Sequence, residues 1–195
     1  MAYGRFSHAL AEGDGISVIA SVEDADSARD AEQQRAEALV VRSDPSSIRE
    51  ATSLPILWRA AVPLERAAGV ADAVMLVYDT YEDDEDGRLE ELHRRADELG
   101  LDCAVEVRNE EELEQALERV DPEIFLLSPA EAGDEGPIEW ILDLLAAIPA
   151  GKLAIADLHV ANEDEVHELE RAGVDGVIVA SRDIAPLAGD APPQV

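Results

Sequence analysis

Eight short runs of apolar, mostly β-branched residues recur along the chain and alternate with longer segments that are rich in charge. Runs of this length that are enriched in Val and Ile are typical of buried β-strands. We expect strands over residues 16–22, 38–41, 55–58, 72–78, 102–107, 123–127, 152–156 and 175–180.

The segments between these runs have the spacing of amphipathic helices. Within residues 87–99 the leucines recur on one helical face, and Gly100 follows as a helix-ending glycine. Asn109 and the three acids after it suit a helix N-terminus, because the amide caps free N–H groups and the helix dipole favours negative charge. We expect helices over residues 26–37, 46–52, 64–68, 87–99, 109–119, 137–147 and 162–172.

Strand and helix alternate through eight units of about 24 residues each, which is the pattern of a (β/α)8 barrel. We therefore expect an α/β fold, a compact single-domain TIM barrel over residues 16–184. An open doubly wound sheet is the main rival, but such a sheet normally uses about five or six strands. Residues 1–15 then form a short N-terminal segment, and residues 185–195, with three prolines, form a loosely held tail.

The charge balance is strongly acidic, because 45 Asp and Glu residues against 15 Lys and Arg residues give a net charge of −30. A surface of this charge repels phosphate backbones and anionic lipids, which argues against nucleic-acid and membrane partners. Two explanations stay open for the acidity, a GC-rich genome and adaptation to high salt. Lys152 is the only lysine, so almost every cation in the chain is a guanidinium.

The chain shows no targeting or anchoring sequence. No apolar run approaches the length of a membrane span, and the N-terminus lacks the basic and apolar blocks of a signal peptide. The single cysteine, Cys103, excludes an internal disulfide and a cysteine-based zinc site. We expect a cytoplasmic protein without a cofactor, and the sequence indicates no particular oligomeric state.

Three stretches together follow the strand and helix order of one known barrel family. SLPILWR (53–59) is similar to its third strand. VADAVMLV (70–77) and the stretch from LEELHRR to VEVRNEEELEQAL (89–117) are similar to its fourth strand, fourth helix and fifth strand. NEDEVHELERAGVDGVIVASRDI (162–184) is similar to its seventh helix and eighth strand. In this order, residues 16–184 resemble the indole-3-glycerol phosphate synthase family of tryptophan biosynthesis.

The resemblance implies an enzyme that closes an indole ring with loss of carbon dioxide, by acid–base chemistry on a phosphorylated aminosugar. The family uses a lysine acid on strand 3, a second lysine on strand 1, and glutamates on strands 1 and 5. An asparagine on strand 6 and a serine on strand 7 help to bind the substrate. A protonated amine suits the acid's role, because it donates a proton to a leaving hydroxyl and then returns to neutral.

Carried over residue by residue, most of these roles fall on a different side chain. The strand-1 glutamate and lysine fall on Ser21 and Glu23, and the strand-3 lysine falls on Arg59. The strand-5 glutamate is retained as Glu106. The remaining positions also differ, since the strand-3 aspartate falls on Ala60, the strand-6 asparagine on Leu127, the strand-7 serine near Leu158 with its following glycine on His159, and the phosphate-gripping strand-8 glycine on Ala180, followed by Ser181.

Arginine at position 59 keeps the charge of the family's lysine but removes the proton transfer, since a guanidinium does not readily lose its proton. Lys152 opens the seventh strand, whereas barrel active sites lie at the C-terminal ends of strands. The residues therefore favour a divergent, shortened barrel that has lost the family's catalysis, and an active synthase with a rearranged site is the alternative. Arg59 and Glu106 are the candidate catalytic residues, with Glu106 either a general base or an ion-pair partner of Arg59.

Four arginines end strands or follow them closely and are expected at one rim of the barrel. Together with Ser181 they suit the binding of a small anionic or phosphorylated metabolite through bidentate contacts. The four residues are Arg42, Arg59, Arg108 and Arg182. In the alternative interpretation, each of them pairs with a neighbouring acid such as Asp44, Glu23 or Asp183.

Acids and one histidine are expected on the same face as this rim. Glu23, Glu106, Asp157 and His159 follow or end the first, fifth and seventh strands. Carboxylates and imidazole are ligands of divalent ions, but these residues lack the spacing of a known metal motif. We therefore expect a mouth lined by Arg–Glu pairs and no metal site.

Overall fold

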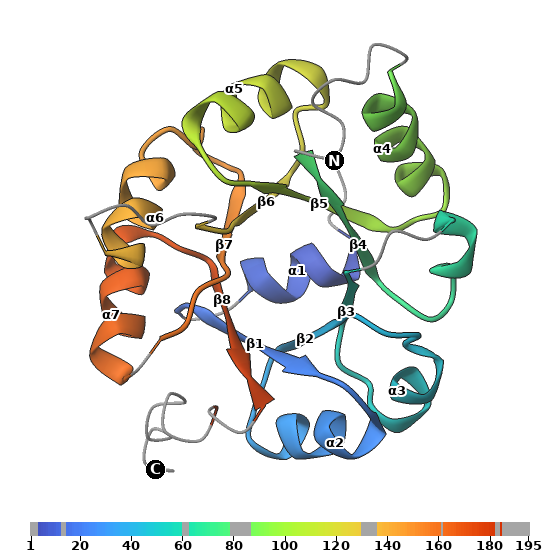
Figure 1. Cartoon of the computed structure of the whole chain (residues 1–195). Coiled ribbons are helices and arrows are strands. Elements are labelled where there is room, and N and C mark those ends of the chain that lie inside the picture. The colour runs from blue at the N-terminus through green and yellow to red at the C-terminus, as the bar shows by residue number, and fades with distance from the viewer. Residues whose placement is uncertain are drawn as a thin grey trace.

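Eight parallel strands close into a barrel in the computed structural model, which describes residues 4–12, 15–59, 63–78, 87–129, 136–160, 162–181 and 184 (Figure 1). The strands follow one another around the barrel in chain order, and β8 pairs with β1. Their bounds are β1 Ser17–Val22, β2 Ala38–Val41, β3 Ile56–Trp58, β4 Ala73–Val77, β5 Asp102–Val107, β6 Ile124–Leu127, β7 Leu153–Ala156 and β8 Gly176–Ala180. The predicted α/β TIM barrel is confirmed, and the open sheet is ruled out.

The seven expected helical segments are all helical, although the one near residue 64 is only a short 3-10 helix. Asn109 and Asn162 cap their helices as predicted, each accepting a hydrogen bond from the third residue of the helix. None of the described helices has both the length and the apolar character needed to cross a membrane. The helices are α1 Arg5–Ala11, α2 Ala25–Gln33, α3 Ser46–Ala51, η1 Leu64–Arg66, α4 Arg88–Glu98, α5 Glu110–Arg119, α6 Pro137–Leu145 and α7 Glu163–Ala172.

Alternation along each strand divides the buried side chains into two clusters. The inner cluster fills the barrel and includes Ile19, Leu57 and Ile178, whereas the outer cluster packs the strands against the surrounding helices and includes Ala20 and Trp58. Successive side chains of a strand point to opposite faces, so residues two apart share a cluster. This rule also determines which side chains reach the mouth of the barrel.

Helix α1 is the element that the sequence did not lead us to expect. It lies within the ring of strands in Figure 1 and contacts β5 and β7. Phe6 and Leu10 are buried in the inner cluster. Leu10 packs close to Gly176, and a Cβ atom added to this glycine would lie 3.4 Å from a methyl carbon of Leu10. The N-terminal segment is therefore a plug for the end of the barrel at which the strands begin.

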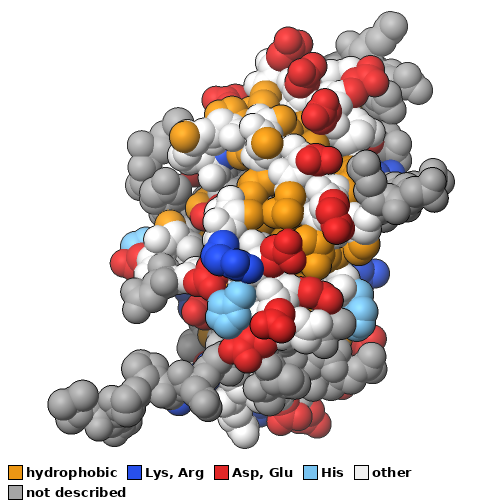
Figure 2. Space-filling model, turned by 90° about the vertical axis from the view of Figure 1, so that its left-hand side faces the viewer, with side chains coloured by type: hydrophobic (Ala, Val, Ile, Leu, Met, Phe, Trp, Pro, Cys, Tyr) orange, Lys and Arg blue, Asp and Glu red, His pale blue; other side chains and the backbone are white. Residues whose placement is uncertain are grey.

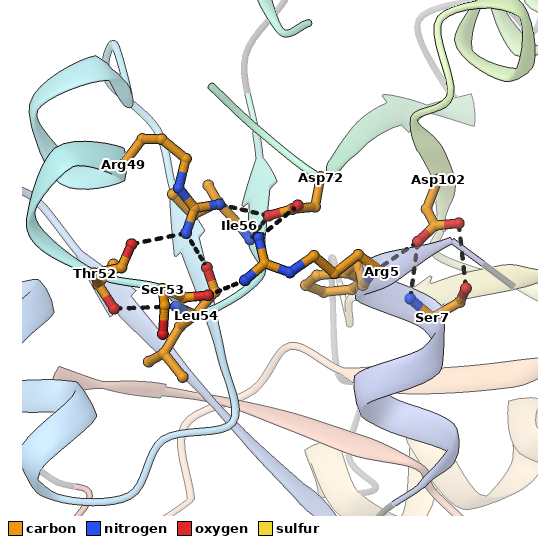
Figure 3. A network of polar contacts seen from close by, with 10 residues as sticks. Arg5, Ser7, Arg49, Thr52, Ser53, Leu54, Ile56, Asp72 and Asp102 are labelled. Carbon is orange, nitrogen blue, oxygen red and sulfur yellow. Dashed lines mark hydrogen bonds and ion pairs between the residues drawn. The ribbon is translucent and has the colours of Figure 1, made fainter. Parts of the chain in front are cut away.

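A carboxylate at the start of β5 holds the first turn of α1. Asp102 accepts hydrogen bonds from the backbone N–H groups of Gly4 (3.1 Å), Phe6 (3.0 Å) and Ser7 (2.9 Å), as Figure 3 shows in part. The first N–H groups of a helix have no partner within the helix, so an external acceptor stabilises it. Asp102 thus caps α1 from a position 98 residues along the chain from Gly4.

A second carboxylate joins α1 to the loop before β3. Asp72 forms ion pairs with Arg49 (2.7 Å) and Arg5 (3.1 Å), and it accepts the backbone N–H of Ile56 at 2.9 Å (Figure 3). Arg5 also donates to the carbonyl of Ser53. The N-terminal face of the barrel is therefore closed by apolar packing and by two carboxylates that each bind several donors.

Replacing Asp102 by alanine should lower the free energy of unfolding by roughly 1–2 kcal/mol, the range for losing a helix cap. Three backbone N–H groups of α1 lose their acceptor in this variant. Urea unfolding followed by circular dichroism measures the change. Asp97→Ala, at an exposed aspartate of α4, is the control and should change stability little. Equal losses in the two variants would show that the cap does not stabilise α1.

Candidate functional site

The strands end at a common rim, and alternation selects the side chains that face the mouth there. Ser21, Arg59, Glu106, Ser128 and Asp157 each lie two residues after a member of the inner cluster. They therefore continue the inward-facing rows of β1, β3, β5, β6 and β7. On these five strands, polar and charged residues replace the apolar ones at this last level, so this part of the mouth is chemically distinct from the core beneath it.

Arg59 joins two carboxylates across the mouth. Its Nη2 donates to Oε1 of Glu106 at 2.8 Å, and its Nη1 pairs with Oδ2 of Asp157. The three side chains are 14%, 5% and 20% exposed, so the contacts are largely shielded from water. Of the two roles left open for Glu106, the structure contains the ion pair with Arg59, and Asp157 adds a second partner. We call Arg59, Glu106 and Asp157 the mouth triad.

The mouth triad has a fixed charge distribution. One guanidinium between two carboxylates leaves a net charge of −1, and charge-assisted hydrogen bonds of this kind are shorter and stronger than neutral ones. A guanidinium stays protonated in proteins, so Arg59 supplies charge and geometry but no proton. The triad therefore has the chemistry of a structural ion pair that links β3, β5 and β7.

Two other predicted rim arginines, Arg42 and Arg108, follow the ends of β2 and β5. Arg42 is exposed after β2 and makes no ion pair within the part of the chain that the structure describes. Asp44, which we considered as its partner, instead pairs with Arg66 at 3.2 Å. Arg108 is half-buried after β5, and Glu112 accepts its backbone N–H at 2.7 Å. Of the four arginines predicted at this rim, Arg59 is one whose ion pairs cross the mouth.

The predicted phosphate-binding residues at the end of β8 are only partly described. Ser181 is half-buried, and its backbone carbonyl accepts a hydrogen bond at 3.4 Å from Nε2 of Gln34, the residue that follows α2. Arg182 and its suggested partner Asp183 lie outside the described residues. Arg182 therefore stays a prediction as a phosphate-binding residue.

Two positions carried over from the family do not face the mouth. Leu127 and Leu158 both belong to the outer cluster, between strands and helices. The inward-facing residues at these strand ends are Ser128 and Asp157, because they continue the rows of Leu126 and Ile155. Counting inward and outward positions along each strand would have selected both residues from the sequence alone.

The acids and the histidine that we expected on the mouth face differ in how exposed they are to solvent. Glu23 and His159 are exposed, whereas Glu106 is 4% exposed and bound to Arg59. Among the described residues, no three His, Cys, Asp or Glu side chains are grouped closely enough to hold a metal ion.

A cavity of about 520 Å³ lies at the opposite end of the barrel, beside α1. Gly4, Asp102, Cys103, Asp121 and Glu123 are among its lining residues. Gly4 caps α1, and the other four precede or begin β5 and β6, so the cavity is remote from the mouth triad. Burial raises the pKa of the Cys103 thiol, and the nearby Asp97 and Asp102 carboxylates raise it further. The thiol is thus protonated and inert in the folded protein.

Comparisons with known proteins place these features in a family. The family model described as "Indole-3-glycerol phosphate synthase" matches residues 43–183. The Halalkalibacterium halodurans protein of that name is 28% identical over 140 residues, covering 69% of this chain and 53% of its own length. The Salinibacter ruber protein of that name is 34% identical over 118 residues, covering 58% of this chain and 41% of its own. The chain spans about half the length of these curated relatives.

A solved structure shares the fold at low sequence identity. The N-acetylmannosamine-6-phosphate 2-epimerase from Clostridium perfringens superposes with a TM-score of 0.69, at 14% identity over 87% of both chains. At this identity the likeness concerns the barrel architecture alone.

Replacing Arg59 by methionine should lower the free energy of unfolding by about 3–5 kcal/mol, because it leaves a buried carboxylate without its cation. Urea unfolding measures the loss. The control is Arg94→Met, which breaks an exposed pair with Glu98 and should change stability little. Adding Glu106→Gln to the Arg59 variant should recover part of the loss, because a neutral amide is easier to bury. No recovery would show that Glu106 is not the group left unpaired.

Cys103 should react with a disulfide reagent far more slowly in the folded protein than in concentrated urea at the same pH. The thiolate is the reacting form, and both burial and the raised pKa of the thiol suppress it. The release of a coloured thiol product measures the rate. Similar rates in the two conditions would show that the start of β5 is open to solvent.

Proposed function

Because the chain belongs to the indole-3-glycerol phosphate synthase family, we propose that it is a non-catalytic member of that family. The mouth triad is the observation that supports the proposal. By its resemblance to the family, position 59 corresponds to the lysine that acts as the acid. This chain has Arg59 there, and its guanidinium is bound to Glu106 and Asp157. An acid catalyst has to release and regain a proton during turnover, and a guanidinium does not do so.

The retained glutamate is also occupied. Glu106 corresponds to the family's strand-5 glutamate, and its Oε1 accepts from Arg59 at 2.8 Å. A carboxylate held by a permanent cation is a poor general base, because proton uptake would break a shielded ion pair. Arg59 and Glu106, the two candidate catalytic residues, are therefore paired with each other in the folded protein.

Lys152, the only lysine of the chain, is not placed to act as the acid instead of residue 59. Lys152 directly precedes β7, and its Nζ pairs with Oδ1 of Asp121 at 2.7 Å. The strands of a TIM barrel begin at the face opposite the active site. The amine of Lys152 is therefore at the wrong end of the barrel for acid catalysis in the mouth.

A small anionic or phosphorylated metabolite remains the proposed ligand class, but the mouth triad changes where it would bind. With a net charge of −1, the triad does not attract an anion. Arg42 is exposed at the end of β2, and Ser181 follows β8. Both strands are neighbours of β1 in the barrel. We place any anion site at this part of the rim rather than on Arg59.

An active synthase with a rearranged site is the alternative, and the retention of Glu106 together with the family match favours it. The two proposals differ in one measurable property. A non-catalytic barrel does not convert carboxyphenylamino-deoxyribulose phosphate to indole-3-glycerol phosphate, whereas a rearranged synthase does.

We expect no indole-3-glycerol phosphate formation above the no-enzyme background when the purified protein is given this substrate. Product is measured by its indole fluorescence, with the Halalkalibacterium halodurans synthase as positive control. The assay is run at low and at molar potassium chloride, with circular dichroism confirming the fold, because acidic proteins differ in salt requirement. Turnover near that of the positive control would refute the proposal and establish the active synthase.

A further inference from the structure

Helix α6 is unlike the other outer helices in its composition. Six of its nine residues are apolar besides its first proline, whereas the neighbouring α5 and α7 each contain five acids. Ile141 and Leu144 are buried against the barrel, but Trp140 and Leu142 are only half-buried. Helices on a barrel surface normally turn charged residues outward. Figure 2 views the side on which Figure 1 places α6 and α7, and it shows an apolar area bordered by acidic side chains.

A groove of about 410 Å³ runs between the start of α5 and α6. Trp140 and Leu144 give it an apolar floor, and Glu110, Glu111 and Asp143 give it acidic walls. Asn109 completes the lining, so none of the described residues that line this groove is basic. The groove therefore combines a contact surface for an apolar side chain with a field that attracts cations.

We propose that the α5–α6 groove is a docking site for a basic segment of a partner protein that carries a large apolar anchor. The anchor packs against Trp140 and Leu144, and flanking Lys or Arg residues meet Glu110, Glu111 and Asp143. Indole rings also attract ammonium and guanidinium groups through the ring face. Binding sites for peptides commonly combine an apolar centre, which takes an apolar anchor of the peptide, with a polar rim around it.

The acidic charge of this chain favours a basic partner over a second copy of the chain as the occupant of the groove. A second copy has a net charge of −30 and would bring the same acidic walls against their equivalents. Like charges brought together at an interface oppose association, whereas a basic segment is attracted before contact and bound after it. The site lies on the outer helices, so the proposal does not depend on whether the mouth is catalytic.

The test uses two synthetic peptides of identical lysine and leucine composition, one with leucines at helical spacing and one with the order scrambled. Fluorescence anisotropy at fixed ionic strength gives their affinities. We expect the first peptide to bind roughly tenfold or more tightly than the second, the scale set by one aromatic hot spot. Trp140→Ala should remove this difference while circular dichroism shows an unchanged fold.

A matched pair of variants separates the groove from general acidity. Glu110→Gln with Glu111→Gln removes two of the three acidic charges in the first turn of α5. Glu163→Gln with Asp164→Asn removes two of the three in the equivalent turn of α7. We expect several-fold weaker binding of the ordered peptide only in the α5 variant. Equal effects in both variants, or equal affinities of both peptides, would overturn the proposal. A dimer in sedimentation that Trp140→Glu dissociates would instead make a second copy the occupant.

Discussion

A charge enclosed by apolar strands has to be matched from within the same barrel, and this constraint organises the C-terminal end of the molecule. Arg59 continues the inward row of β3, and its matching carboxylates come from β5 and β7. None of these strands are neighbours, so the pairing spans the opening instead of running along one edge. Removing the arginine alone, or the carboxylates alone, would leave a buried charge without its partner. The three side chains of the mouth triad therefore depend on one another.

The two ends of the barrel are closed by different physical means. At the N-terminal face, α1 supplies Phe6 and Leu10 to the inner cluster, and carboxylates bind its first turn and its arginine. At the C-terminal face, the paired charges of the mouth triad link the ends of β3, β5 and β7. With both ends occupied, the surface that differs most from an ordinary acidic exterior is the apolar flank of α6.

The sequence predicted the barrel well because its determinants are local. The β-branched runs locate all eight strands, and Asn109 and Asn162 begin their helices where capping chemistry requires. Helix α1 escaped prediction because it is only seven residues long and its capping carboxylate is Asp102, far away in the chain. Asp157 as a partner of Arg59 likewise depends on the closure of the barrel, although alternation along β7 already placed it inward.

The capping of α1 by Asp102 also has a consequence for biosynthesis. Gly4 and Asp102 are separated by 98 residues, so α1 has no acceptor for its free N–H groups until the chain has grown to Asp102. Contacts of such long sequence separation form late, after a costly loop closure. Helix α1 is therefore capped only after β1 to β4 and the start of β5 have been synthesised.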